Sequence, residues 1–311
     1  MNTPPAIFLM GPTASGKTAA AITLAQHLPV ELISVDSALV FRDMNIGTAK
    51  PDAATLEVAP HFLIDIIDPT DVYSAANFRT DALRLMEEIT ARGNIPLLVG
   101  GTMLYYRALR FGLSELPQAD ESVRAEIDAE AEIHGWPYMH SKLAMLDAET
   151  AARLKPNDTQ RIQRALEICI VSGQKMSDLL KQQQPYELPY RLIPIALVPS
   201  ERKVLHERIA TRFYNMMKEG LLEEVEELQQ KYELSADMPS MRCVGYRQAW
   251  QFLQGEISRD ELPEHGIAAT RQLAKRQLTW LRGMPDNIEL DCLNPHLAQH
   301  VRSAVEKFLY N

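Results

Sequence analysis

The sequence predicts an α/β protein in which a parallel β-sheet core with covering helices is interrupted by an inserted all-helical subdomain. Three observations lead to this class. Apolar runs alternate with helical patterns over the first hundred residues, strand signals vanish between residues 121 and 183, and a strand-like run then returns before long helices. Strands that alternate with helices favour a parallel sheet with right-handed crossovers.

The sheet is predicted from short apolar runs bounded by turn residues. "AIFLM" precedes a glycine-rich loop, and "IPLLVG" follows the helix-ending "RGNIP". The predicted strands are Ala6–Met10, Glu31–Val35, Phe62–Ile66, Ile95–Gly100 and Tyr190–Pro199. Helices are expected over 17–27 and 75–92, and another is expected to begin at Met103.

The helical insertion begins after "LSELPQAD", residues 113–120, where the pattern changes. Its predicted helices are 121–134, 138–146, 148–154, 159–172 and 175–183, and the "KPND" turn supplies a proline and an N-cap candidate before the fourth. We therefore expect residues 1–118 and 190–311 to form the core with the C-terminal helices, and residues 119–189 to form the insertion.

Composition restricts the class of protein. With 311 residues, 46% apolar and 23% charged, the chain resembles a soluble globular protein, and its apolar runs are too short for a membrane span. No signal peptide is apparent, and three separated cysteines suggest no disulfide framework, so a cytoplasmic protein is expected. The net charge of −9 disfavours non-specific coating of nucleic acid but allows a local basic groove.

"GPTASGKT" fits the phosphate-loop pattern G-x-x-x-x-G-K-[ST] between a predicted strand and a predicted helix, which indicates a P-loop NTPase-like core. Backbone N–H groups and the helix dipole bind phosphates, the lysine adds a cation, and the last hydroxyl can hold Mg²⁺. The motif alone suggests ATP, yet a diphosphate on any organic group offers similar oxygens. The predicted phosphate-binding residues are Gly11, Pro12, Thr13, Ala14, Ser15, Gly16, Lys17 and Thr18, with Thr18 as the metal ligand.

Two further residues follow strands of the predicted sheet. Asp36 ends the second strand, where ligands of open α/β sheets bind, and it can cap a helix, hold a metal or accept a proton. Thr102 follows Gly100 and Gly101 and either caps the next helix or directs its hydroxyl into the same crevice.

Six blocks of sequence together resemble the bacterial tRNA dimethylallyltransferases, also called tRNA isopentenyltransferases. They are "GPTASGKT", "DSALVFRDMNIGTAKP", "LVGGTMLYYRAL", "PNDTQRIQRALEI", "RCVGYRQAW" and "ATRQLAKRQLTWLRG", in the order found in that family and spanning nearly the whole chain.

The resemblance implies a reaction. The exocyclic amine of adenosine 37, in tRNAs that read codons beginning with U, attacks dimethylallyl diphosphate, and diphosphate leaves without ATP consumption. Asp36 is then the expected general base, and Thr102 hydrogen-bonds the bridging oxygen. Mg²⁺ is the expected cofactor, and a monomer that binds the anticodon stem-loop and no membrane is expected.

The resemblance also implies a surface that binds the RNA, which includes the helical insertion. Gln160, Arg161 and Arg164 share one helical face, and Arg271, Lys275 and Arg282 form a basic stripe, although solvated polar faces are the usual alternative. Arg212 is expected to contact substrate. The predicted tRNA-binding residues are Asp36, Ser37, Ala38, Leu39, Thr102, Arg124, Gln160, Arg161, Ile162, Gln163, Arg164, Met241, Arg242, Cys243, Val244, Gly245, Tyr246, Arg271, Lys275, Arg276 and Arg282.

Two other classes of function share these features. A kinase of small metabolites has the same sheet and loop but needs a nucleotide-base pocket and turns over ATP. A non-catalytic RNA-binding protein uses the loop only to order its own structure. Prenyl transfer, ATP hydrolysis or binding alone distinguishes the three.

Overall fold

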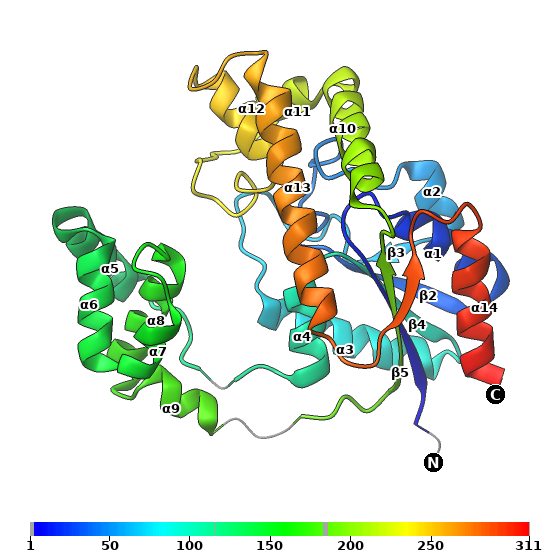
Figure 1. Cartoon of the computed structure of the whole chain (residues 1–311), viewed down its shortest axis with the longest axis horizontal. Helices are drawn as coiled ribbons and strands as arrows, with labels where there is room; N and C mark the ends of the chain where they lie inside the picture. Colours follow the sequence, from blue (N-terminus) through cyan, green and yellow to red (C-terminus); the bar gives the residue numbers. More distant parts are fainter. Residues whose placement is uncertain (1–2, 115, 183–185, 311) are drawn as a thin grey trace. The chain divides into compact units, whose positions relative to one another are not determined.

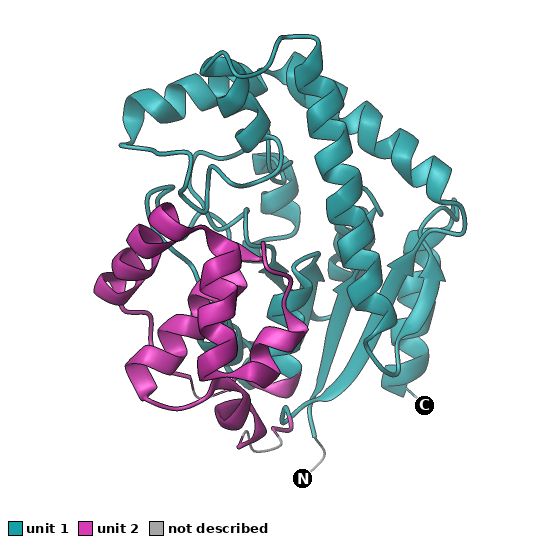
Figure 2. Ribbon diagram, turned by 60° about the vertical axis from the view of Figure 1, so that its left-hand side comes forward, with its two compact units in different colours: residues 1–110, 188–311 teal, residues 111–187 magenta. Residues whose placement is uncertain are grey.

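The computed structural model of the chain describes residues 3–114, 116–182 and 186–310. The chain divides into two compact units, Met1–Arg110 with Leu188–Asn311 (unit 1) and Phe111–Glu187 (unit 2), which Figure 2 distinguishes by colour. The predicted insertion, residues 119–189, begins later than unit 2, because the sequence pattern changes only near residues 113–120.

Unit 1 contains a parallel sheet, of six strands within the described residues, in the order β3-β2-β4-β1-β5-β6 (Figure 1). The strands are β1 Pro5–Met10, β2 Val30–Val35, β3 His61–Phe62, β4 Ile95–Gly100, β5 Arg191–Val198 and β6 Ile288–Asp291. Strand β1 pairs with both β4 and β5, so the loop that follows β1 emerges at the centre of the sheet.

The helices of unit 1 cover both faces of this sheet. They are α1 Lys17–His27, α2 Ala53–Val58, α3 Ala75–Ala91, α4 Met103–Phe111 (its last residue falls in unit 2), α10 Arg202–Glu219, α11 Leu221–Lys231, α12 Tyr246–Leu253, α13 Glu261–Arg282 and α14 Leu297–Tyr310. Helix α3 begins at a capping box formed by Ser74 and Asn77.

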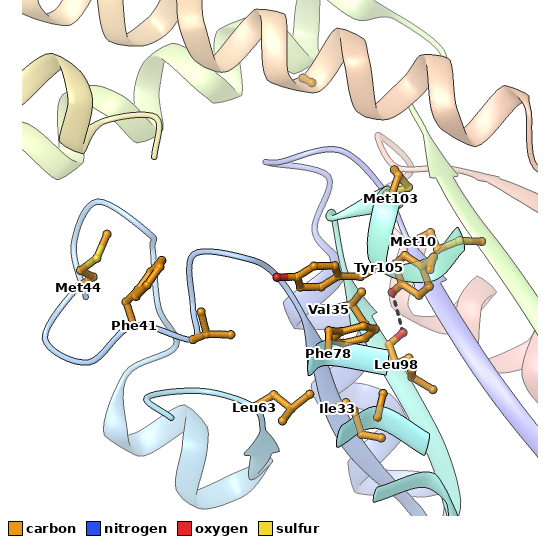
Figure 3. Packing of buried hydrophobic residues seen from close by; sticks show 14 of the residues in the cluster. Met10, Ile33, Val35, Phe41, Met44, Leu63, Phe78, Leu98, Met103 and Tyr105 are labelled. Atoms are coloured by element: carbon orange, nitrogen blue, oxygen red, sulfur yellow. Dashed lines mark hydrogen bonds between the residues drawn. The ribbon is translucent and has the colours of Figure 1, made fainter. Parts of the chain in front are cut away.

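Alternation along the strands divides the core. Ile7, Leu9 and Leu32 pack with α1 and α14, whereas Phe8 and Ile33 belong to a larger cluster with α3, α4 and α10–α13. Figure 3 shows Val35, the last residue of β2, beside Phe78 and Tyr105 of this cluster, whose rings stack with their centroids 4.4 Å apart. The large cluster therefore packs against the carboxyl ends of β2 and β4.

One predicted strand is mostly wrong. The sequence predicted Phe62–Ile66, but β3 covers only His61–Phe62. Leu63 and Asp65 have positive φ angles of 65° and 55°, which interrupt an extended strand. The chain turns there because the backbone amides of Asp65 and Ile66 donate to the carbonyls of Leu39 and Val40.

Unit 2 contains helices joined by loops, and no strand, within its described residues. It contains α5 Glu121–His134, α6 Trp136–Leu146, α7 Ala148–Arg153, α8 Thr159–Ser172 and α9 Met176–Lys181. The end of the last helix was predicted at Gln183, which lies outside the described residues. The core of unit 2 includes Ile127, Met139, Leu143, Ile162 and Leu166. A buried carboxylate, Asp147, accepts hydrogen bonds from Thr150 and from the Ser177 amide, and these bonds lower its pKa to about 2 although burial opposes the shift.

Candidate active site

A cavity of about 540 Å³ opens in unit 1 at the carboxyl ends of β1, β2 and β4. Its lining includes Lys17 and Thr18 of the glycine-rich loop and its helix, Asp36 after β2 and Thr102 after β4. Helices α10 and α13 add Arg212 and further polar side chains. Of the predicted phosphate-binding residues, Thr13, Lys17 and Thr18 line this cavity together with both predicted catalytic residues, as expected at the carboxyl ends of the strands in an open parallel sheet.

The glycine-rich loop leaves little room for a side chain at Gly11. A Cβ at Gly11 would lie 2.7 Å from Ser15 Oγ and 3.0 Å from Leu197 Cβ. Gly16 has a φ angle of 82°, and helix α1 begins directly after it. The loop therefore holds a curled backbone at a helix N-terminus, which is the geometry that binds phosphate oxygens.

Lys17 lies within this curl. Its Nζ donates to the carbonyl oxygens of Gly11 at 3.0 Å and Pro12 at 2.7 Å. Burial lowers the pKa of Lys17 to about 8, and the nearby Asp36 carboxylate opposes that shift. Since a bound anion would restore the charged form, this ammonium is suited to phosphate binding.

Asp36 follows β2, and its Oδ1 accepts a hydrogen bond from the Ala38 amide at 2.9 Å. Burial raises the pKa of Asp36, while this amide and the charges of Lys17 and Arg212 oppose the rise. No ion pair involves Asp36 within the described ranges. A carboxylate whose basicity is raised by burial is suited to accept a proton.

Thr102 joins the ends of β4 and β2. Its amide donates to the Val35 carbonyl at 3.1 Å, and its Oγ1 accepts from the Ser37 amide at 3.0 Å. The backbones of β2 and β4 approach so closely here that a Cβ at Gly100 would lie 2.0 Å from the Val35 carbonyl oxygen. This contact explains the glycine before the turn and sets Thr102 beside the loop that carries Asp36.

Two helical side chains contact the phosphate loop. Arg212 Nη1 donates to Thr13 Oγ1 at 3.3 Å, and burial lowers the pKa of Arg212. Gln277 accepts from the Thr13 amide at 2.9 Å and donates to the Gly101 carbonyl at 2.9 Å. Arg212 was predicted from the sequence, whereas Gln277 was not. Its signal was a polar residue on the apolar face of α13, three residues from Ala274 and four from Leu281, both buried.

Buried Glu224 holds another segment of the cavity wall in place. Its carboxylate accepts from the amides of Asn45, Ile46 and Gly47 and from the Tyr246 hydroxyl at 2.5 Å. The segment held in this way, 44–51, contributes Gly47, Thr48, Ala49 and Pro51 to the cavity lining. Sequence reasoning missed Glu224 because a glutamate in "LLEEVEEL" looks like part of a solvated helix face.

Some residues of the segment 241–246 line the cavity, and the others are buried. Arg242, Cys243 and Val244 line the cavity, and burial raises the pKa of Cys243 to about 12. Met241 and Tyr246 are 1% and 0% exposed in the free chain, so their contact with RNA stays a prediction. Gly245 is also buried, with a φ angle of 96° and its amide bound to Gln248 Oε1.

The predicted basic stripe on α13, which consists of Arg271, Lys275 and Arg282, is exposed, and so is the neighbouring Arg276. Of these, Arg276 also lines the cavity, as does Trp280. The guanidinium of Arg107 lies 5.6 Å from the centroid of the Trp280 ring. Ser37, Ala38 and Leu39, also predicted to contact RNA, line the same cavity.

In unit 2, the predicted cations are engaged by carboxylates. Arg124 and Arg164 pair with Glu167, which is fully buried, at 2.9 and 2.6 Å, and Arg161 pairs with Asp158 at 2.8 Å. Gln163 donates to Asp128, and Gln160 is exposed. The Ile162 side chain is 0% exposed in the core of the unit, so a contact between Ile162 and RNA stays a prediction.

The cavity also offers hard oxygen ligands. The Thr18 hydroxyl and the Asp36 carboxylate line it, together with Ser34, whose buried Oγ has no hydrogen-bond partner within the described residues. Oxygen donors of this kind suit Mg²⁺. The described residues contain no cluster of three or more His, Cys, Asp or Glu side chains that could hold a metal. No helix among them is long and apolar enough to cross a bilayer.

The fold and cavity define a phosphate-loop protein of the α/β class with a carboxylate beside the loop. Comparison with known proteins makes this class specific. The family model described as IPP transferase matches residues 39–284, and the one described as isopentenyl transferase matches residues 5–70. The chain belongs to the IPP transferase family.

Curated relatives and solved structures agree with this assignment. A tRNA dimethylallyltransferase of Methylobacillus flagellatus is 62% identical over 99% of this chain and 98% of its own length. That of Dechloromonas aromatica is 60% identical over 98% of each chain. A tRNA isopentenylpyrophosphate transferase from Bacillus halodurans has a TM-score of 0.71 at 36% identity, covering 98% of this chain and 95% of its own. A eukaryotic dimethylallyltransferase acting on tRNA has a TM-score of 0.79 at 25% identity, covering 98% and 79%.

Proposed function

We propose that this chain transfers a dimethylallyl group from dimethylallyl diphosphate to N6 of adenosine 37 in tRNAs that read codons beginning with U. Its relatives named tRNA dimethylallyltransferase are about as long as this chain and share 58–62% of their residues with it. The observation that carries the proposal is that Lys17, Asp36 and Thr102 line a single cavity, with the two charges free of ion pairs in the described residues.

The phosphate loop binds the leaving group. As the bond between C1 and the bridging oxygen breaks, its electron pair moves onto diphosphate. The backbone amides at the start of α1 and the Lys17 ammonium stabilise that charge, and Arg212 lies beside the loop through Thr13. The Thr102 hydroxyl, which donates to Ser37 Oγ at 3.3 Å, turns to donate a hydrogen bond to the bridging oxygen when the diphosphate binds.

The Asp36 carboxylate receives the proton of the nucleophile. The adenine N6 attacks C1, a C–N bond forms, and one N6 proton passes to Asp36 Oδ2, since Oδ1 is engaged by the Ala38 amide. The raised pKa of Asp36 favours this transfer. To reach the cavity, the base must leave the stack of the anticodon loop.

Mg²⁺ is the proposed cofactor. The Thr18 hydroxyl would hold it, with the unpartnered Ser34 hydroxyl in the same lining, and the Asp36 carboxylate stays available for the proton. When bound, the ion adds positive charge to the departing diphosphate.

The exposed cations of α13 are the proposed contacts to the RNA backbone, together with Arg242 and the helix face of unit 2 that carries Gln160 and Arg161. A protein of net charge −9 needs such a local basic surface to bind RNA. We further propose that the enzyme is cytoplasmic and that it acts as a monomer. Sedimentation of the purified chain with and without RNA would test the oligomeric state.

The function is tested by label transfer. The protein is incubated with Mg²⁺, labelled dimethylallyl diphosphate and an anticodon stem-loop with adenosines at positions 36 to 38. We expect label in the RNA, and its loss when adenosine 37 is replaced by guanosine. ATP hydrolysis without label transfer would instead support a kinase, and RNA binding alone would support a non-catalytic protein.

A further inference from the structure

Gln277 is a buried polar side chain that the proposed reaction does not use directly. It lies on α13 and is 8% exposed. Its amide joins two segments far from it in sequence. Oε1 accepts from the Thr13 amide at 2.9 Å, and Nε2 donates to the Gly101 carbonyl at 2.9 Å.

The chemistry of these two bonds requires an amide. The Thr13 N–H can only donate and the Gly101 carbonyl can only accept, so both the side chain and its orientation are determined. Glutamate would keep an acceptor for Thr13 but lose the donor to Gly101. The contact with Gly101 is close, because a Cβ there would lie 2.3 Å from Gln277 Nε2.

The two segments carry the two halves of the reaction. Thr13 belongs to the phosphate loop, and its hydroxyl also accepts from Arg212. Gly101 precedes Thr102, whose Oγ1 binds the Ser37 amide next to Asp36. We infer that Gln277 is a positioning residue that sets the distance between the diphosphate-binding loop and the turn that carries Thr102.

This inference rests on the proposed function, in which C1 must sit between a held leaving group and an aligned nucleophile. Errors of about 1 Å in such alignment reduce rates by about 100-fold. A glycine-containing loop has little stiffness of its own, and α13 supplies a rigid element that spans both segments.

The experiment compares Gln277→Leu, Gln277→Glu and the control Gln272→Leu, which makes the same change at an exposed position of the same helix. Three quantities are measured for each: the Kd of Mg²⁺-diphosphate by calorimetry, kcat for prenyl transfer, and the Kd of the anticodon stem-loop. Thermal unfolding is followed in parallel.

For Gln277→Leu we expect kcat about 10- to 100-fold lower, a diphosphate Kd about 10-fold higher, and RNA affinity within about two-fold of the parent chain. Gln277→Glu keeps the Thr13 bond, so its diphosphate Kd stays near that of the parent chain while kcat falls. Gln272→Leu should match the parent chain in all three.

Wild-type kcat and diphosphate affinity in Gln277→Leu would overturn the inference. So would equal losses of RNA and diphosphate affinity that follow the melting temperature in both Gln277 variants, because that pattern indicates a merely structural side chain. If the parent chain binds diphosphate but transfers no prenyl group, the proposed function fails, while the diphosphate affinities still test Gln277.

Discussion

Two clusters of buried charge, Glu167 with its arginines in unit 2 and the cavity charges in unit 1, differ in how the charge is compensated. In unit 2, Glu167 is fully buried, and it is neutralised by Arg124 and Arg164. Burial alone would raise the pKa of Glu167, but hydrogen bonds from Arg164, the Asp120 amide and Arg124 lower it. In unit 1, Lys17, Asp36 and Arg212 line a cavity, and the described residues offer them no ion pair.

The difference indicates what each charge is for. A buried charge with a partner supports the fold, and breaking such a pair destabilises the protein. A buried charge without one has a pKa shifted toward the neutral form, as Lys17, Asp36 and Arg212 all have, and such groups concentrate at functional sites. Substitution of the cavity charges in unit 1 should therefore reduce activity, and substitution of Glu167 in unit 2 should reduce stability.

The largest expected effect is that of Asp36→Ala. Loss of the base should lower kcat by about 10²–10⁴-fold, while RNA affinity stays within about three-fold. Asp36→Asn keeps the size and the hydrogen bond from Ala38 but not the basicity, so it should lose as much. Single-turnover transfer measures kcat, and turnover near that of the parent chain in either variant would remove Asp36 from the base role.

Lys17→Met should have the next largest effect. Removal of one donor to the departing charge lowers kcat by about 10²–10³-fold. The free energy of unfolding should stay equal or rise, because the substitution removes a buried ammonium without an ion pair. Kinetics and urea unfolding of the same preparation test both statements, and a large loss of stability would contradict the contrast between the units.

Glu167→Gln should show the reverse. Arg124 and Arg164 lose their buried counter-ion, and we expect a loss of about 1–3 kcal/mol in the free energy of unfolding. Diphosphate affinity should not change. The control is Glu149→Gln, which breaks the exposed pair with Lys181 in the same unit and should cost less than about 0.5 kcal/mol. Equal urea midpoints for the two variants would show that the buried pair adds nothing.

The smallest expected effect is a pH dependence. Because burial lowers the pKa of Lys17 to about 8, its ammonium is lost as the pH rises through that value. Metal-free diphosphate should therefore bind more weakly above pH 8, by up to about tenfold per pH unit. Lys17→Arg stays charged and should lose this dependence. Identical slopes in calorimetry of both proteins would place the pKa of Lys17 elsewhere.

Parts of the site that depend on local sequence were predictable. The phosphate loop, the helix after it and the positions of Asp36 and Thr102 at strand ends follow from a continuous motif and from strand patterns. The exposed face of α13 follows from helical spacing.

What depends on partners distant in sequence was not predictable. Gln277 and Thr13 are 264 residues apart, and Glu224 and Ile46 are 178 apart, so no local pattern shows that these polar groups are buried together. The burial of Tyr246 was not predictable for the same reason, since its hydroxyl partner lies on another helix. Phe62–Ile66 was predicted as a strand because its apolar residues do not show the positive φ angles at Leu63 and Asp65.

A crystal of this chain soaked with Mg²⁺ and an unreactive thiolo analogue of dimethylallyl diphosphate tests the central claim most directly. The account predicts diphosphate density against the backbone amides of Gly11–Thr18 and Lys17 Nζ, with C1 facing Asp36. A loop that stays empty, or that binds only an adenine nucleotide under the same conditions, would contradict it.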